Sequence, residues 1–373
     1  MKTYPLKNLV IAGGGHASLP LIKMGHIWRE KNLSITLISA EPYLVYSGAL
    51  PQYMGGFYEW HQTAIDLEEL CDRYGVHFSQ DRVTSVDHHN KIISTENGSS
   101  TPFDLLVINV GASTRNQPNI ENGYPVKPMS ELLSLKKKII SGRVKNILIK
   151  GGGAAGTEIA LNLSHPKNQN NCKITITELN SRLLSGFPLQ ASERATKILS
   201  SRGVDILTGE KYISIDSSAF DAVIYATGNN PESVNIAHSL PTNSSNRIVT
   251  DRTLLVKDTQ SIFAAGDTAD VDGLKLPQIG VHAVKQGVTL RHNINALLAG
   301  KPLKPYKPYP LNPLIISNGS DDAMFIAKKT VFSGKSSAVL KYLLDMRWLE
   351  KYTLVSANRR SLYRLLTDGI KRS

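Results

Sequence analysis

Two glycine-rich turns, far apart along the chain, most constrain how this sequence can fold. The first spans residues 13–18 and the second residues 151–156, and each follows a short apolar run. Each turn also opens a segment with the residue pattern of a helix. A strand, a glycine-rich turn and a helix in this order begin a βαβ unit whose turn can cradle a phosphate group. The chain is therefore expected to build this unit twice.

Strand and helix patterns alternate through most of the chain. Strands are expected at residues 9–12 and 34–39 around a helix at 16–29, and residues 105–110 are a continuous apolar run typical of a buried parallel strand. After residue 146 the pattern restarts, with strands expected at 147–150, 173–178, 204–207, 222–226 and 261–267 and helices at 154–163, 190–201 and 278–298. This alternation predicts an α/β fold with two doubly wound, Rossmann-like dinucleotide-binding domains and a small C-terminal region.

Two stretches have the composition of connections. Residues 116–128 contain proline and asparagine, and residues 301–313 hold five prolines that predict an extended linker. We therefore expect one discontinuous domain of residues 1–120 and 235–310, and a second domain of residues 121–234. Residues 311–373 are expected to form a C-terminal basic amphipathic region.

Composition narrows the class of protein. At 373 residues, with 41% hydrophobic and 20% charged residues, the chain resembles soluble globular proteins. No apolar stretch approaches the roughly 18 residues that cross a bilayer, and the first strand begins too early to leave room for a signal peptide. Cys71 and Cys172 are the only cysteines and lack the spacing of a redox pair. A reducing cytoplasm is therefore the expected compartment.

Positive charge is concentrated at the C-terminal end. The formal net charge is +12, and residues 301–373, with 14 Lys or Arg against five Asp or Glu, carry +9 of it. The nearly balanced remainder argues against nucleic acid as a partner. The basic end combines a predicted helix at 338–352 with a second amphipathic segment at 362–370. Such helices lie on anionic membranes, although their apolar faces can equally pack on the protein or on a second subunit of a homodimer.

The three glycines of a dinucleotide-binding turn have separate tasks. The first allows a tight turn, the second allows the backbone to approach a pyrophosphate, and the third allows the helix to pack close to the strand. The second turn has the full set, at Gly151, Gly153 and Gly156. The first turn has Gly13 and Gly15 but Ser18 in the third place, and serine is still small enough for close packing.

The residue that ends the second strand of each unit should meet the adenosine ribose. Glu178 stands there in the second unit, where its carboxylate would accept the ribose hydroxyls and repel a 2′-phosphate. This favours NADH over NADPH, although Arg182 lies nearby. A solvated strand-end glutamate is the alternative. In the first unit the acid arrives late, so Glu41 and Ser39 both remain candidates for the ribose contact.

These motifs resemble the pyridine nucleotide-disulphide oxidoreductase superfamily of FAD-dependent proteins, and the likeness covers nearly the whole chain. Residues 13–18, 151–158, 226–228 and 264–267 carry it. Within the superfamily the chain looks most like the type II NADH dehydrogenase-like branch. A narrower match, to flavoproteins fused to selenide water dikinase, rests on residues 13–16, 45–51 and 340–348, but no kinase domain is present here.

The resemblance implies that the first turn holds FAD and the second NAD(P)H. Asp267 would bind the ribityl chain, a helix starting near Gln278 would point its positive end at the flavin pyrimidine, and residues 46–51 would flank the isoalloxazine. An ordinary turn with a helix cap is the alternative for Gly266 and Asp267. The expected cofactor-binding residues are Gly13, Gly15, His16, Ala17, Ser18, Ser39, Glu41, Ser47, Gly111, Gly151, Gly153, Gly156, Glu178, Gly228, Gly266, Asp267 and Gln278.

Glu158, on the helix after the second turn, is the expected catalytic residue. In related flavoproteins the glutamate of this motif lies near the nicotinamide and flavin, where a carboxylate could position the nicotinamide amide or relay a proton. The alternative is a helix-start glutamate favoured by the helix dipole. Cys71, in a predicted helix, fits a core residue better than a redox centre. No histidine or cysteine spacing predicts a metal.

The predicted function is an FAD enzyme that takes hydride from NAD(P)H and passes electrons to a second acceptor, with a quinone favoured. A soluble enzyme with a specialised, selenium-related acceptor is one alternative. A non-catalytic flavin-binding regulatory protein is another. The expected location is cytoplasmic, either free or peripheral on the inner face of the cell membrane.

Overall fold

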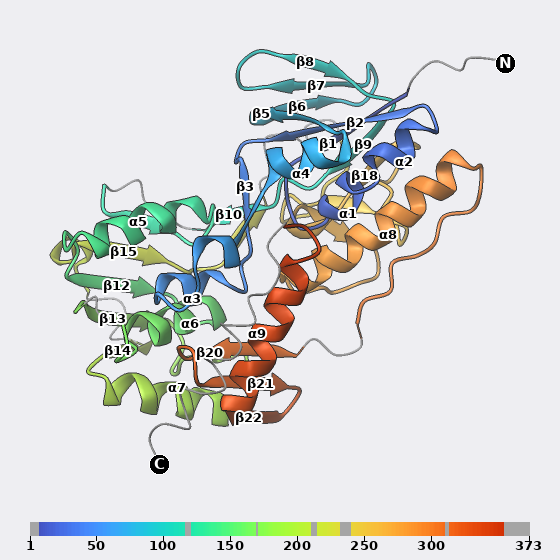
Figure 1. Ribbon diagram of the computed structural model, residues 1–373. Helices are drawn as coiled ribbons and strands as arrows, with labels where there is room; N and C mark the ends of the chain where they lie inside the picture. The colour runs from blue at the N-terminus through green and yellow to red at the C-terminus, as the bar shows by residue number, and fades with distance from the viewer. Residues whose placement is uncertain are drawn as a thin grey trace. The chain divides into compact units, whose positions relative to one another are not determined.

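A computed structural model describes residues 7–115, 121–168, 171–209, 215–231, 240–309 and 313–353. The chain divides into two compact units (Figure 1), each built around its own parallel sheet. Unit 1 comprises residues 1–44, 65–113 and 229–310, and unit 2 comprises residues 45–64, 114–228 and 311–373.

The central sheet of unit 1 has five parallel strands in the order β18-β9-β1-β2-β5. Their bounds are Lys7–Ala12 for β1, Leu33–Ser39 for β2, His77–Gln80 for β5, Leu105–Ile108 for β9 and Ile262–Ala264 for β18. Of the three inner strands, β9 is apolar and buried throughout, and β1 is apolar and buried over residues 9–12. A parallel strand covered on both faces requires such a continuous apolar run, which is why the sequence identified it.

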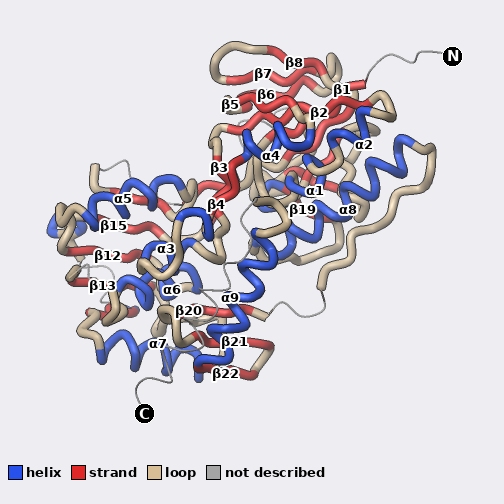
Figure 2. The backbone as a smooth tube through the Cα atoms, in the orientation of Figure 1, coloured by secondary structure: helices blue, strands red, loops and turns tan. Residues whose placement is uncertain are grey.

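Helices flank this sheet (Figure 2). They are α1 (Leu19–Ile22), α2 (Gly25–Arg29), α4 (Leu67–Tyr74) and α8 (Gly280–Leu298). The single helix predicted over residues 16–29 is wrong, because the structure has two short helices there. The break places Gly25 so close to α4 that a Cβ on it would lie 2.1 Å from the carbonyl oxygen of Tyr74. The helix predicted from residue 278 begins two residues later, at Gly280.

Three antiparallel strands lie beside the parallel sheet of unit 1 (Figure 1). They are β6 (Val83–Asp87), β7 (Ile92–Thr95) and β8 (Ser100–Pro102), and the first two share a hydrophobic core with β1 and β9. Unit 1 also holds the pair β17 (Ile248–Thr250) and β19 (Ala269–Val271), and the short 3-10 helix η5 (Gly266–Thr268). The proline-rich stretch is extended as predicted but packs on this unit, since Tyr306 is fully buried.

The central sheet of unit 2 repeats the architecture with the order β11-β15-β12-β13-β14, again parallel. Its strands are β11 (Gly123–Pro125), β12 (Asn146–Lys150), β13 (Lys173–Glu178), β14 (Asp205–Thr208) and β15 (Ala222–Tyr225). Its helices are α5 (Ser130–Ile140), α6 (Ala154–Leu163) and α7 (Leu189–Ser201), with the 3-10 turn η3 (Ser217–Ala219). The predicted α/β fold with two Rossmann-like sheets is therefore confirmed.

The described part of the C-terminal region belongs to unit 2. It forms an antiparallel sheet of β20 (Leu314–Ser317), β21 (Ala323–Ala327) and β22 (Thr330–Gly334), against which α9 (Lys335–Leu349) packs. Ile316, Met324 and Ile326 join the same hydrophobic core as Ile159 of α6. This shared core explains why the region is not separate from the sheet of unit 2.

Residues 45–64 also belong to unit 2, although they precede most of it in sequence. They contain α3 (Leu50–Met54), which contacts α6, and the 3-10 turn η1 (Trp60–Gln62). The chain passes between the units through two short strand pairs, β3 (Tyr43–Val45) with β4 (Ala64–Asp66) and β10 (Ala112–Thr114) with β16 (Asn229–Pro231). Within the described ranges, no helix combines the length and apolar character needed to cross a membrane.

Candidate functional site

The first glycine turn joins the end of β1 to the start of α1. Gly13 adopts a φ of +98°, and a Cβ there would lie 2.4 Å from the carbonyl oxygen of Asn109. The Ser18 hydroxyl donates to the Gly13 carbonyl at 2.7 Å and accepts from the Asn109 amide at 2.9 Å. Ser18 therefore ties the turn to the helix and to the strand beside it, which a glycine could not do.

Asn109 is a site residue that the sequence did not single out. It is buried, although it ends the apolar run of β9, and its side-chain oxygen would meet a Cβ placed on Gly266 at 2.7 Å. A polar residue at the end of a buried parallel strand was the available signal. Of the other predicted residues near this turn, Ala17 is buried against Gly287 of α8, where a Cβ would lie 2.5 Å from the Ala17 carbonyl oxygen.

The second turn joins β12 to α6, and its three glycines are constrained differently. A Cβ on Gly156 would lie 1.9 Å from the Gly151 carbonyl oxygen, and Gly151 itself has a φ of +110°. A Cβ on Gly153 would meet no protein atom within 4 Å. The protein's own packing therefore requires glycine at 151 and 156, whereas the space beside Gly153 is open. This space is where a dinucleotide pyrophosphate would approach the backbone, so the turn fits that ligand.

Glu178 ends β13 and holds the second turn. One carboxylate oxygen accepts the Gly152 N–H at 2.7 Å, and the other accepts the backbone and side-chain N–H groups of Asn180. Glu178 is buried rather than solvated. Arg182 hydrogen-bonds to three backbone carbonyls, those of Leu184, Ser185 and Phe187.

Among the described residues of unit 1, no buried carboxylate lies at the corresponding strand end. Ser39 is buried, and its hydroxyl donates to the backbone carbonyl of Glu41 at 2.9 Å. A Cβ on Gly14 would lie 2.9 Å from this hydroxyl, so Ser39 stands against the first turn. Ser47, in the loop expected beside the isoalloxazine, is exposed and lies in unit 2.

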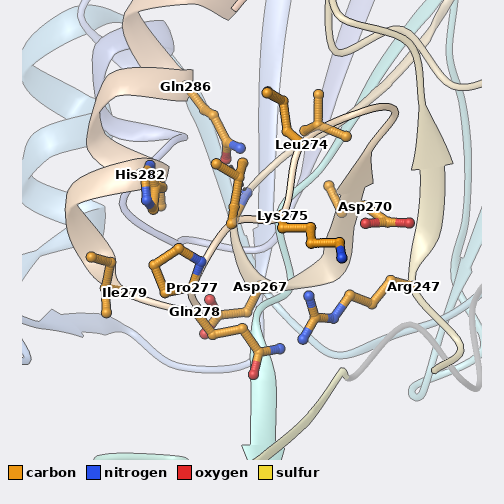
Figure 3. Close-up of a pocket in the computed structure, with 15 residues that line it drawn as sticks. Arg247, Asp267, Asp270, Leu274, Lys275, Pro277, Gln278, Ile279, His282 and Gln286 are labelled. Carbon is orange, nitrogen blue, oxygen red and sulfur yellow. Dashed lines mark hydrogen bonds between the residues drawn. The ribbon is translucent and has the colours of Figure 1, made fainter. Parts of the chain in front are cut away.

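A cavity of about 480 Å³ opens at the start of α8 in unit 1 (Figure 3). Asp267 and Gln278 both line it, with Arg247 and Asp270 on the side away from His282. The Gln278 amide nitrogen is buried and has no hydrogen-bond partner among the described residues. A buried donor without a partner is costly, so this cavity suits a ligand with acceptor atoms, as a flavin has.

Gly111 and Gly228 follow the ends of β9 and β15. Both have positive φ, +85° and +96°, and a Cβ on either would meet nothing within 4 Å. The Gly111 N–H donates to the Thr268 hydroxyl at 2.9 Å, which ties the end of β9 to the segment that carries Asp267. The carboxyl ends of neighbouring parallel strands thus lie next to each turn, where ligands of such sheets bind.

Glu158 lies on α6, two residues after the last glycine of the second turn. One of its carboxylate oxygens accepts the Ser317 backbone N–H at 2.8 Å and the Ser317 hydroxyl at 2.7 Å. The Glu158 carboxylate is therefore hydrogen-bonded to β20 and not to the backbone at the start of α6. Burial raises the pKa of Glu158, and the nearby Lys341 ammonium acts in the opposite direction.

Lys341 is not the surface cation that the basic tail predicted. It is 4% exposed, and its ammonium lies 3.0 Å from Asp345 and 3.9 Å from Glu158. It also donates to the carbonyl of Gly48. Helix geometry explains the burial of Lys341, because residues four apart lie on the same face of a helix. Lys341 and Asp345 therefore share the buried face of α9, which also carries Tyr342. The predicted segment at 362–370 lies outside the described residues.

Cys71 is a core residue in a helix, as predicted. Cys71 is fully buried on α4, and burial raises the pKa of its thiol to about 12. Cys172 is half-buried, and its thiol donates to the carbonyl of Val144. The described parts of the chain contain no group of three or more acidic, histidine or cysteine side chains that could hold a metal ion.

Residues 7–287 match the pyridine nucleotide-disulphide oxidoreductase family, and the chain belongs to this family. A demethylphylloquinone reductase, NdbB of Synechocystis sp., is 26% identical over 368 residues, which cover 90% of this chain and 91% of the relative. A type II NADH:quinone oxidoreductase of Staphylococcus aureus is 23% identical, covering 91% and 94% of the two chains. The predicted superfamily and its type II NADH dehydrogenase-like relatives are therefore confirmed.

Solved structures share the fold. NDH2 from Plasmodium falciparum in complex with NADH superimposes with a TM-score of 0.78 at 16% identity, covering 98% of both chains. The sulfide:quinone oxidoreductase from Aquifex aeolicus gives a TM-score of 0.73 at 18% identity, covering 96% of this chain and 95% of that one. At these identities the likeness concerns the arrangement of the chain.

Proposed function

We propose that this protein is an FAD-dependent oxidoreductase that takes hydride from NADH and passes the electrons to a quinone. The single observation that carries the proposal is the duplicated strand–turn–helix, with an open approach at Gly153 and a buried carboxylate at Glu178. The named activities of the two curated relatives, quinone reduction and NADH:quinone oxidoreduction, support the same reaction. Its balance is NADH + H⁺ + quinone → NAD⁺ + quinol.

Residues 1–120 and 235–310 are assigned to FAD. Bound FAD would accept a hydride, which carries two electrons, from one substrate and deliver those two electrons to the next. The chain's contribution is to hold it. The first turn and Ser18 would bind the pyrophosphate, Asp267 the ribityl hydroxyls and Gln278 an acceptor atom of the ring, because its buried amide has no partner among the described residues.

Residues 121–234 are assigned to NADH. The N-terminus of α6 and the open side of Gly153 would bind the pyrophosphate. Glu178, fixed by Gly152 and Asn180, would meet the ribose hydroxyls. A buried carboxylate at this place repels the 2′-phosphate of NADPH, so NADH is the preferred donor.

Glu158 is assigned the role of proton donor. The reaction consumes one proton, and burial, which raises the pKa of Glu158, favours the protonated carboxyl that could donate it. Glu158 lies in the same helix as the NADH-binding turn, and Ser317 fixes its orientation through two hydrogen bonds. The proton must then be replaced from solvent before the next turnover.

A selenium-related acceptor is the second candidate. The narrower likeness to flavoproteins fused to selenide water dikinase rests partly on residues 45–51 and 340–348. These segments touch within unit 2, where the rings of Tyr46 and Trp348 stack with centroids 4.5 Å apart and Lys341 donates to Gly48. Selenium compounds should therefore be included in any acceptor screen.

The C-terminal end is assigned to an anionic membrane surface, and under this assignment the protein would bind peripherally to the inner face of the cell membrane. Three leucines of α9 are exposed, namely Leu340, Leu343 and Leu344, and the net positive charge of the chain is concentrated in the same region. Packing of this surface on a second subunit, to form a homodimer, is the competing arrangement.

Anaerobic reduction separates the enzyme from a non-catalytic flavin-binding protein. The purified yellow protein is mixed with NADH without oxygen, and the flavin absorbance is followed. Bleaching, followed by recovery when a short-chain quinone is added, is expected. Bound FAD that NADH fails to reduce would contradict the oxidoreductase function.

A further inference from the structure

Unit 2 buries three charged side chains side by side. Glu158 of α6, Lys341 and Asp345 of α9 are each more than nine-tenths buried. One cation and two carboxylates leave a net charge of −1 if all three are ionised. Burying an uncompensated charge is expensive, so such a cluster favours taking up one proton.

The two carboxylates do not share the cation equally. The Lys341 ammonium lies 3.0 Å from Asp345 but 3.9 Å from Glu158, and it points a further N–H at the Gly48 carbonyl. The short contact is an ion pair with a hydrogen bond, whereas the long one is a Coulombic contact only. Asp345 therefore takes most of the stabilisation that Lys341 can give.

Other groups around the cluster reinforce this asymmetry. Asp345 accepts the Tyr58 hydroxyl at 3.2 Å and hydrogen-bonds to Tyr46. These donors favour its ionised form. Among the described residues, the Glu158 carboxylate accepts hydrogen bonds from the Ser317 N–H and hydroxyl, both at one oxygen, and has Lys341 at the longer distance of 3.9 Å. Tyr342 is buried beside Tyr58, with the two ring centroids 6.0 Å apart in an edge-to-face arrangement.

We propose that Asp345 is a positioning residue that competes with Glu158 for Lys341 and thereby keeps Glu158 protonated at neutral pH. This proposal rests on the proposed function, in which Glu158 supplies the proton that the acceptor consumes. Asp345 touches neither substrate nor cofactor in this scheme and acts only through the ammonium. Burial raises the pKa of both carboxyls, consistent with one retained proton, while Lys341, paired with both, keeps a raised pKa despite its burial.

The central test is Asp345→Asn, which removes the charge and nearly preserves the shape. Lys341 is then paired with Glu158 alone, so Glu158 should ionise. The alkaline limb of the pH profile of kcat, measured with NADH and a short-chain benzoquinone, should move down by at least one pH unit. Above that limb the variant should be about tenfold slower than the unchanged protein. The rate of flavin reduction by NADH should not change.

Asp322→Asn is the matched control. Asp322 lies in the same unit and pairs with Arg194 at 2.9 Å, but it is not part of the buried cluster. The pH profile of kcat of Asp322→Asn should coincide with that of the unchanged protein. Lys341→Met supplies a second variant in case Asp345→Asn does not fold. Without the ammonium, Glu158 should hold its proton more tightly, so the alkaline limb should move to higher pH.

Infrared spectroscopy of the purified holoprotein gives a readout independent of turnover. A protonated carboxyl band at neutral pH, identified by its loss in Glu158→Gln, should be present in the unchanged protein and absent in Asp345→Asn. The proposal is overturned if that band is absent from the unchanged protein, if Asp345→Asn retains it, or if Asp345→Asn and Lys341→Met shift the profile in the same direction. If the unchanged protein reduces no quinone, the proposed function fails, whereas the infrared result still decides the role of Asp345.

Discussion

The Glu178 carboxylate accepts the backbone N–H of Gly152 at 2.7 Å, across the mouth of the second glycine turn. The residue that ends β13 therefore fixes the conformation of the turn after β12. A Cβ on Gly152 would lie 2.8 Å from the Cβ of Glu178, so the two chain segments approach as closely as their backbones permit. Glutamate at this position thus has a structural role in addition to its proposed contact with the ribose.

Glu178→Ala should weaken NADH binding at least tenfold, or about 1.4 kcal/mol, while the FAD content stays unchanged. Both the ribose acceptor and the bond to Gly152 are lost. Titration of protein fluorescence with NADH measures the first quantity, and the flavin absorbance of the purified protein measures the second. The isosteric Glu178→Gln should narrow the preference for NADH over NADPH. Loss of FAD with unchanged NADH affinity would mean that the two sites are assigned the wrong way round.

Gly153→Ala and Gly156→Ala form a pair that separates ligand binding from folding. Alanine at 153 meets no protein atom within 4 Å and keeps a negative φ of −70°, so the variant should fold with an unchanged thermal midpoint yet bind NADH at least tenfold more weakly. Alanine at 156 would stand 1.9 Å from the Gly151 carbonyl oxygen, and it should destabilise unit 2 by several kcal/mol. Normal NADH binding by Gly153→Ala would place the pyrophosphate elsewhere.

Lys136 should make folding stability depend on pH in the alkaline range. It is buried on α5, donates to the Met54 carbonyl at 2.8 Å, and burial lowers its pKa from 10.5 to about 8. The folded chain therefore releases this proton near pH 8, whereas the unfolded chain keeps it until about pH 10.5. Between these values the unfolded state binds more protons, so this contribution to the free energy of unfolding rises with pH.

Lys136→Met isolates this contribution from other groups that titrate in the same range. The difference in unfolding free energy, unchanged protein minus variant, should increase by on the order of 2–3 kcal/mol between pH 7 and pH 10. Urea denaturation at several pH values measures it. A difference that stays constant, or falls with pH, would mean that Lys136 keeps its ammonium in the folded chain.

Removal of residues 354–373 should weaken binding to vesicles that contain anionic lipid, with no change in the unfolding transition. This segment carries five Lys or Arg and one Asp. Flotation at low salt measures binding, and vesicles of neutral lipid are the control. Removal from residue 337 should instead unfold unit 2, because it deletes Lys341, Asp345 and the buried Leu349. Aggregation or loss of a dimer in the shorter truncation would favour the subunit interface.

The regular elements near both turns were accessible from the sequence because their signals are local. Continuous apolar runs predict buried parallel strands, and the glycine spacing predicts a tight turn before a helix. The division of the single helix predicted over residues 16–29 was not accessible in the same way. It depends on the close approach of Gly25 to Tyr74, which are far apart in sequence.

The sequence by itself determined the duplicated Rossmann-like architecture and the positions of both turns, since each depends on residues within about 30 positions of one another. Tertiary structure alone decided that Asn109 secures Ser18, that residues 45–64 belong with the second sheet, and that Lys341 is buried between two carboxylates. Composition counted Lys341 as one more basic residue of a charged tail. Its environment depends on α6 and α9, and segments so distant in the chain are brought together only by the packing of a common core.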